Sequence, residues 1–137
     1  MNNQIKPLPE RKSINTLHDL FKARIDLTPH DIAYSTFNQR SQSWQTIQWL
    51  EMFRIFVHVR NAIAAENLVK GDRVLVSVSN GIKWIAIEQA AAYLGIVFVA
   101  LNPSETAANI NHIIDDTDPK LIFIESDSYL KAIVAHT

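Results

Sequence analysis

The chain of 137 residues has the size of one domain, and its 13 Lys and Arg residues against 14 Asp and Glu residues leave a net charge of -1. That balance provides no basic surface for nucleic acid or for an anionic membrane, so we expect neither partner. The absence of cysteine excludes disulfides and thiolate zinc sites, while a polar start and apolar runs far below about 18 residues predict a cytoplasmic protein with no membrane span.

The first third of the chain predicts a helix followed by a β-hairpin. Residues 1–15 are polar and contain two prolines, so we expect a loose lead-in there and a single domain over 16–137. Thr16 stands three residues before Asp19, as in a capping box, and the helix that follows ends at Thr28-Pro29. Strand-forming residues over 32–37 and 44–48 flank the polar turn NQRSQS.

The remainder predicts alternating strands and helices. Apolar residues at spacings of three and four over 49–66 are typical of an amphipathic helix. Strands are then expected at 73–79, 96–101 and 120–125, and helices at 82–94, at 107–117 after the cap Thr106, and from Asp127 onward. This order with short links predicts the α/β class, a βαβαβ parallel sheet preceded by a helix and a β-hairpin.

The helix predicted at 82–94, IKWIAIEQAAAYL, is apolar nearly all round. Such a helix is normally buried on more than one side, whereas a lone βαβ domain leaves its outer flank in water. Another element or a partner is therefore expected to cover it. The competing interpretation is that alanines at 86, 90, 91 and 92 only inflate the apolar count.

Few residues form a pattern with catalytic or metal-binding spacing. His112, Asp115 and Asp116 share a helix face, but three or more convergent groups are needed for a metal site, so a solvated helix end is the favoured interpretation. The other histidines, at positions 18, 30, 58 and 136, are scattered. Trp44, Trp49 and Trp84 are expected to pack in the core or between layers, with Trp84 the one candidate for lining an acyl path.

No phosphate-binding loop is evident. The only glycines, Gly71, Gly81 and Gly95, lie far apart, whereas the dinucleotide fingerprint needs three spaced glycines in one turn. Asn80-Gly81 is therefore interpreted as a plain strand-to-helix turn. Ser77 and Ser79 lack the flanking pattern of a nucleophile elbow.

Three stretches carry a family resemblance: TLHDLFKARIDLTPHDIAY at 16–34, WQTIQWLEMF at 44–53, and LVKGDRVLVSVSNGIKWIAIEQAAAYLGIVFVALNPSETAANINHIIDDTDPKLIF at 68–123. In this order they resemble the amino-terminal portion of the adenylate-forming (AMP-binding) superfamily, and most of all its long-chain acyl-CoA synthetases. Three positions depart from that pattern. Gln48 replaces a Ser or Thr cap, which implies a loss of about 1 kcal/mol, Lys83 replaces an acidic residue, and Ala100 replaces a proline.

The resemblance implies two-step chemistry in a complete enzyme, which uses ATP, magnesium and coenzyme A to convert a fatty acid to its acyl-CoA. It also implies where the reacting groups come from: a Ser/Thr/Gly-rich loop ending in Pro-Lys, an acidic magnesium ligand, an Asp on the ribose and a Lys in a mobile carboxy-terminal domain. All of these would follow position 137. No catalytic, cofactor-binding or metal-binding residue is therefore assigned within this chain.

Three functions remain open from the sequence. The leading hypothesis is an amino-terminal fragment of an acyl-CoA synthetase that is inactive in isolation, with the remainder of the enzyme or a second copy as its partner. The alternative is a stand-alone α/β interaction module that docks through the apolar helix 82–94. A small nucleotide-binding α/β domain rests on the βαβ pattern alone.

Overall fold

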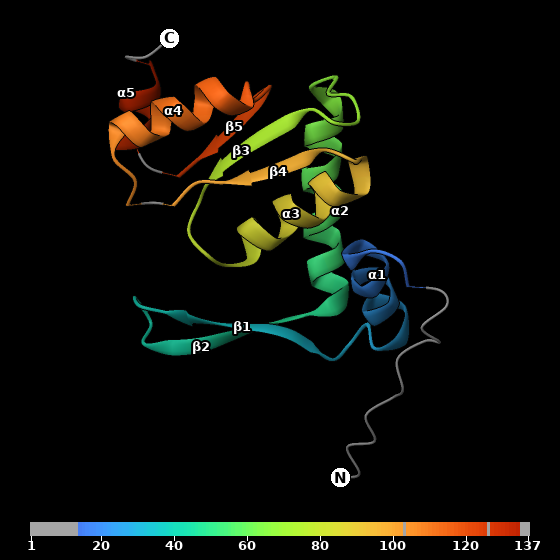
Figure 1. Cartoon of the computed structure of the whole chain (residues 1–137). Coiled ribbons are helices and arrows are strands. Elements are labelled where there is room, and N and C mark those ends of the chain that lie inside the picture. Colours follow the sequence, from blue (N-terminus) through green and yellow to red (C-terminus); the bar gives the residue numbers. More distant parts are fainter. Residues whose placement is uncertain (1–13, 103, 126, 135–137) are drawn as a thin grey trace.

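The structure is a computed structural model that describes residues 14–102, 104–125 and 127–134. Most of the expected lead-in lies outside these residues. The helices and strands in chain order are α1 (Leu17–Leu27), β1 (Ile32–Asn38), β2 (Ser43–Gln48), α2 (Trp49–Ala65), β3 (Arg73–Ser77), α3 (Ile82–Leu94), β4 (Val97–Ala100), α4 (Ala107–Thr117), β5 (Leu121–Ile124) and α5 (Asp127–Val134) (Figure 1). Each expected helix and strand is present, with strand ends shifted by one or two residues.

Strands β3, β4 and β5 form a parallel sheet in the order β4-β3-β5, which confirms the predicted α/β class. Arg73 pairs with Val97 at the start of the β3–β4 ladder, and Val74 pairs with Leu121 at the start of the β3–β5 ladder. The central strand β3 is buried from its second residue to its last. A strand with neighbours on both sides and helices on both faces has no water-facing side, which explains its high content of valine.

The sheet separates two clusters of apolar side chains. On one face, Val74, Val76 and Val78 pack with the residues of α3, α2 and α1. On the other face, Leu75 packs with Ile110 of α4 and with Ile133 of α5. Figure 1 shows α3 and α4 on opposite sides of the sheet. This arrangement follows from right-handed crossovers, because the chain first moves from β3 to β4 and then reverses direction to reach β5.

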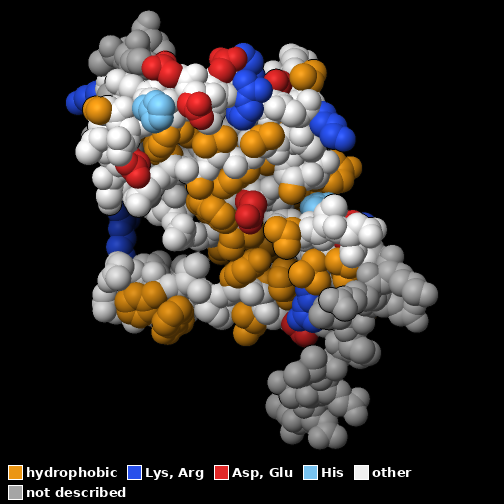
Figure 2. Space-filling model, viewed as in Figure 1, with side chains coloured by type: hydrophobic (Ala, Val, Ile, Leu, Met, Phe, Trp, Pro, Cys, Tyr) orange, Lys and Arg blue, Asp and Glu red, His pale blue; other side chains and the backbone are white. Residues whose placement is uncertain are grey.

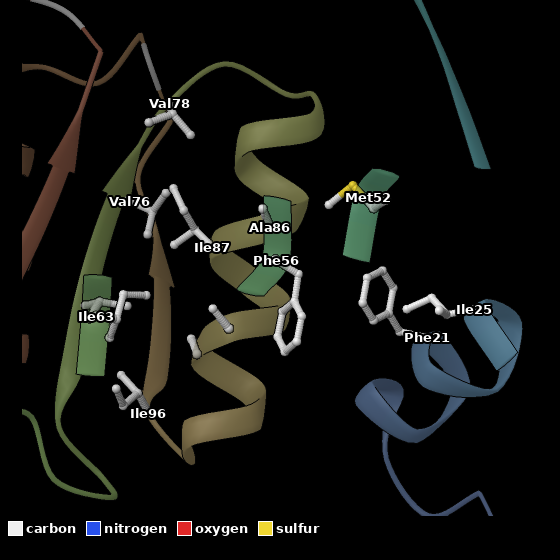
Figure 3. Close-up of a cluster of buried hydrophobic side chains, with 13 residues drawn as sticks. Phe21, Ile25, Met52, Phe56, Ile63, Val76, Val78, Ala86, Ile87 and Ile96 are labelled. Carbon is white, nitrogen blue, oxygen red and sulfur yellow. The ribbon is translucent and has the colours of Figure 1, made fainter. Parts of the chain in front are cut away.

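Helix α3 is covered from within the chain. Its buried residues are Ala86, Ile87, Gln89, Ala90 and Ala91. Helix α2 packs along it, and α1 contacts both helices, so that Met52 and Phe56 of α2 and Phe21 and Ile25 of α1 extend the cluster away from the sheet (Figure 3). Alanines 86, 90 and 91 are fully buried. These three alanines are therefore packing positions, and the interpretation that the alanines only inflate the apolar count is wrong for them, while it fits the exposed Ala92.

The structure confirms the predicted amino-terminal caps of α1 and α4. The Asp19 backbone N–H donates to Thr16 Oγ1 at 3.0 Å, and the Thr16 N–H donates to the Asp19 carboxylate at 2.9 Å, completing a capping box. At α4 the Thr106 hydroxyl accepts from the Asn109 N–H at 3.3 Å. At α2, where Gln48 replaces the usual Ser or Thr, the Gln48 N–H donates to the Glu51 carboxylate at 2.9 Å.

Strands β1 and β2 form the predicted antiparallel hairpin, with Phe37 opposite Trp44. Tyr34 faces the body of the molecule and packs against Trp49 at a ring distance of 5.6 Å. Phe37 and Trp44 contact each other at 5.5 Å, but the Trp44 side chain is 69% exposed. The expectation that Trp44 packs in the core is therefore wrong. Phe37 lies an odd number of residues from Tyr34, so we expect Phe37 and its partner Trp44 on the face of the ribbon opposite to Tyr34. Figure 2 shows apolar side chains at the far end of the hairpin.

Candidate functional site

The carboxyl ends of the three parallel strands are the natural place for a site in this fold. Ligands of open α/β sheets bind outside the carboxyl ends of the strands, because the loops that follow them converge there. Strand β3 ends at Ser77, β4 at Ala100 and β5 at Ile124. The candidate site therefore consists of the turn at 78–81, the start of α3, and the residues that follow β4 and β5.

Glu125 is the charged centre of this edge. Its carboxylate accepts the Ser79 backbone N–H at 2.8 Å, and the Lys83 ammonium lies 3.5 Å away. The hydrogen bonds from Ser79, followed by the charge of Lys83, hold the pKa of Glu125 below its usual value. The Glu125 N–H donates to the Ser77 carbonyl at 3.1 Å. Glu125 thus ties the end of β5 to the turn after β3, and it is engaged as an ion-pair partner.

An apolar recess of about 490 Å³ opens beside this ion pair. Helix α2, helix α3 and strand β5 enclose it, and its lining consists of Ile55, Val59, Val78, Lys83, Ile87, Phe123, Ile124 and Glu125. Among the described lining residues, the charged groups are the paired Lys83 and Glu125. The recess can therefore accept an apolar group, and its described lining residues include no nucleophile with a base beside it.

A second recess of about 440 Å³ lies between the hairpin and the start of α3, lined by Tyr34, Ser35, Thr36, Phe37, Asn80, Gly81, Ile82 and Ile85. Gly81 precedes the first residue of α3 and has extended backbone at φ 162°. A Cβ built on Gly81 would meet no atom within 4 Å. The turn thus has room for a side chain and forms an ordinary strand-to-helix connection, in line with the sequence interpretation of Asn80-Gly81.

The other sequence candidates do not meet. His112, Asp115 and Asp116 are exposed on α4, and within the described ranges no three His, Cys, Asp or Glu side chains gather as metal ligands would. His30 and His58 are exposed, and His136 lies outside the described residues. His18 is half-buried, with the rings of Phe56 and Tyr93 beside it. Trp84 packs edge-on against Phe98 at 4.9 Å.

The polar groups at this edge do not fit a magnesium–triphosphate site. Glu125, the carboxylate that follows β5, already accepts from Ser79 and pairs with Lys83. Ser77 is only 3% exposed. Magnesium with a nucleotide requires free carboxylate oxygens and donors to the phosphates, and the described part of the edge assembles neither.

Sequence reasoning noted Lys83 as a departure but did not single out Glu125. These residues lie 42 positions apart, and nothing local in the sequence indicates that they pair.

The length and composition of the helices also bear on membrane insertion. None in the described part of the chain has both the length and the apolar character to cross a bilayer.

Comparison with known proteins places this geometry in a family. A family profile described as AMP-binding enzyme matches residues 21–137. The long-chain-fatty-acid–AMP ligase FadD28 of Mycobacterium tuberculosis is 26% identical over 131 residues, which cover 90% of this chain and 22% of FadD28.

Two solved structures show the same fold. VinN in complex with 3-methylaspartate is 22% identical with a TM-score of 0.76, covering 90% of this chain and 33% of VinN. A Mycobacterium tuberculosis fatty acyl CoA synthetase is 23% identical with a TM-score of 0.72, covering 84% of this chain and 22% of the synthetase. The chain thus spans about a fifth to a third of the length of these proteins. Since the family profile covers most of its residues, the chain belongs to the AMP-binding enzyme family.

Proposed function

We propose that this chain is the amino-terminal portion of an AMP-forming acyl-CoA synthetase and is inactive by itself. In the complete enzyme, a fatty-acid carboxylate would attack the α-phosphorus of ATP and release pyrophosphate, and the thiol of coenzyme A would then take the acyl group and release AMP. The observation that carries this proposal is the family match over residues 21–137 together with the 22% coverage of FadD28.

The open sheet supports the proposal. Helices α4 and α5 pack on the same face of the sheet, through Ile110 and Ile133. The chain runs from β4 through α4 to β5, and so moves across the sheet toward the β5 edge. Because crossovers are right-handed, a connection through α5 on the same face would place a following parallel strand farther in that direction. A parallel strand following α5 in a longer protein would then pair with β5, so this segment has the form of part of a larger sheet.

The chemistry of the described residues supports the claim that the chain is inactive by itself. Both steps of adenylate chemistry develop negative charge that needs fixed donors. The three glycines of the chain are isolated, and the Glu125 carboxylate is neutralised by Lys83 and the Ser79 N–H. The segment would therefore supply scaffold to the complete enzyme, while the groups that hold the triphosphate would come from other segments.

The direct test is ATP–pyrophosphate exchange and AMP release by the purified 137-residue chain with magnesium, a fatty acid and coenzyme A. We expect no turnover above a protein-free blank, while FadD28 in the parallel reaction with ATP and fatty acid forms the adenylate that its name describes. Fatty-acid-dependent AMP release by the chain would overturn the claim of inactivity.

A second candidate function is an interaction module that binds a partner through α3. One observation favours it: Tyr93 of α3 and Val97 of β4 are 53% and 47% exposed, and Figure 2 shows apolar side chains in a band across α3 and β4. The packing of α1 and α2 on α3 limits the area left for such a partner. Size-exclusion chromatography with a pull-down separates the hypotheses, because a module would give a hetero-complex of fixed composition that Tyr93→Ser weakens.

A further inference from the structure

We propose that Asn80 is a site of spontaneous covalent modification, at which the side-chain amide becomes a carboxylate through a cyclic imide formed with Gly81. Asn80 is the one asparagine in the sequence that glycine follows. The reaction requires the backbone nitrogen of the following residue to reach the asparagine side chain. A side chain on that following residue hinders this approach, whereas glycine has none and its backbone is the most permissive.

The turn around Asn80 leaves the reacting atoms unhindered. Asn80 is exposed, and Gly81 lies between it and the first residue of α3. A Cβ built on Gly81 would meet no atom within 4 Å, so the space beside this residue is open. Among the described residues, neither the Asn80 side-chain amide nor the Gly81 N–H has a hydrogen-bond partner. No hydrogen bond within the described chain therefore has to break before the Gly81 nitrogen attacks.

The position of this turn does not depend on where the sheet ends. The turn follows β3, the central strand, and both neighbours of β3 lie within the described chain. Asn80 and Gly81 line the recess of about 440 Å³ together with Ser35 and Thr36 of the hairpin. A recess of this size with polar groups on its wall admits water. Water can therefore reach the imide, which the second step of the reaction requires.

The reaction balances with water as the single co-reactant. The Gly81 backbone nitrogen loses its proton to a base in the solvent and attacks Cγ of Asn80. An N–Cγ bond forms, the Cγ–Nδ2 bond breaks, and the leaving nitrogen takes up a proton and departs as ammonia. Water then opens the imide, without oxidation or reduction. Cleavage of the new N–Cγ bond gives aspartate, whereas cleavage at the backbone carbonyl of residue 80 gives isoaspartate, in which the main chain passes through Cγ.

The product carries a negative charge beside an existing ion pair. The Ser79 N–H donates to the Glu125 carboxylate at 2.8 Å, and the Lys83 ammonium lies 3.5 Å from that carboxylate. A carboxylate just before α3 is favoured by the unpaired N–H groups at the start of the helix, so the aspartyl form fits this turn. The isoaspartyl form adds a backbone carbon between β3 and α3, and we expect it to weaken the contact of Ser79 with Glu125. The inference requires no enzymatic activity, so it is independent of the proposed function.

Peptide mapping by mass spectrometry tests the proposal on the folded 137-residue chain, incubated in neutral and in mildly alkaline buffer. We expect the peptide that contains Asn80 to gain the mass difference between an NH₂ and an OH group, and to gain it faster in alkaline buffer because the attacking nitrogen must lose its proton. Aspartyl and isoaspartyl forms should both appear, with Asn80→Asp as the chromatographic standard for the first. The isoaspartyl form identifies the imide route, since direct hydrolysis of the amide gives aspartate alone.

Asn67 is the internal control in the same sample. It is exposed and lies outside helices and strands, as Asn80 does, but Leu68 follows it. We therefore expect Asn67 to stay unmodified over the same period. The matched variant is Gly81→Ala, which the open space at Gly81 accommodates and which should slow the reaction severalfold. Asn80→Gln should lose the mass gain, because its longer side chain would have to close a larger ring.

A parallel incubation in urea separates the folded turn from the unfolded chain. The proposal requires that Asn80 reacts in the folded protein, so modification that occurs in urea alone would overturn it. Modification of Asn67 at the same rate, or an unchanged rate in Gly81→Ala, would show that glycine does not direct the reaction. Formation of aspartate without isoaspartate would exclude the imide.

Discussion

His18 occupies the junction of three helices. Its ring lies 5.2 Å from Phe56 of α2, 5.1 Å from Tyr93 of α3 and 6.0 Å from Phe21 of its own helix. The Arg60 guanidinium lies over the Phe56 and Tyr93 rings at 5.9 and 5.4 Å. Burial lowers the pKa of His18 below 6.5, and this effect outweighs the opposing influence of Gln89 and of the charge of Asp19.

This lowered pKa predicts acid sensitivity. The folded state favours neutral His18, so between its lowered pKa and 6.5 the unfolded state binds more protons, and the free energy of unfolding falls as pH drops through that window. Urea unfolding across this pH range measures the slope. We expect His18→Gln to flatten it and His112→Gln, at an exposed position on α4, to leave it unchanged.

Carboxylates with lowered pKa do not obscure the effect of His18. Hydrogen bonds lower the pKa of Asp19, Asp118 and Glu125 from their ordinary values of 3.8 to 4.5. The contributions of these carboxylates to the free energy of unfolding are therefore lost only at pH values below the window in which His18 acts. If the His18→Gln variant keeps the parent's slope just below pH 6.5, burial of this imidazole is not the cause of the acid sensitivity.

At the scale of the element, helix α3 begins and ends with glycine for different reasons. Gly95 ends the helix in the left-handed region at φ 71°, and its N–H donates to the carbonyls of Ala91 and Ala92. A Cβ on Gly95 would come within 2.9 Å of Lys70 Cγ. Gly81 has extended backbone and open space around it. Only the glycine at the carboxyl end is therefore required by the conformation.

The two glycines predict opposite responses to alanine. Gly95→Ala should reduce the free energy of unfolding by about 1–2 kcal/mol, because a side chain in the left-handed region is strained. Gly81→Ala should change it by no more than about 0.5 kcal/mol, since a weaker helix cap is offset by a less flexible unfolded chain. Thermal and urea unfolding measure both, and equal losses would contradict this account of the helix end.

At the scale of the whole molecule, Phe56 joins the helical layers on one face of the sheet. It is 2% exposed and lies between Phe21 of α1, Phe53 of its own helix and Tyr93 of α3, with ring distances of 5.7 to 5.9 Å. Helices α1 and α3 therefore depend on the same buried ring. Trp44 on the hairpin contacts Phe37 in the open, away from both clusters.

Replacing these two rings should have unequal effects. We expect Phe56→Ala to reduce the free energy of unfolding by about 3–5 kcal/mol, because it removes a large side chain from a closed cluster. Trp44→Ala should cost about 1 kcal/mol or less, since only an exposed aromatic pair is lost. Urea unfolding at constant pH gives both values, and a comparable loss for Trp44→Ala would mean that the hairpin packs more tightly than its exposure indicates.

Local signals in the sequence were sufficient to predict the helices and strands of this protein. The apolar spacing of α2, the caps Thr16 and Thr106 and the stop at Gly95 act within a few residues, so the sequence alone determined where helices and strands lie and that the sheet is parallel. The family resemblance likewise depended on ordered local motifs, and the family match over 21–137 confirmed it.

Only the tertiary structure decided how these elements cover one another. The burial of α3 by α2, the exposure of Trp44, and the joining of Glu125 to Ser79 and Lys83 all involve partners distant along the chain. A side chain's own pattern gives its face of a helix or strand but not the segment that will lie against that face. That choice depends on the burial of apolar surface summed over the whole molecule, which no local stretch of sequence contains.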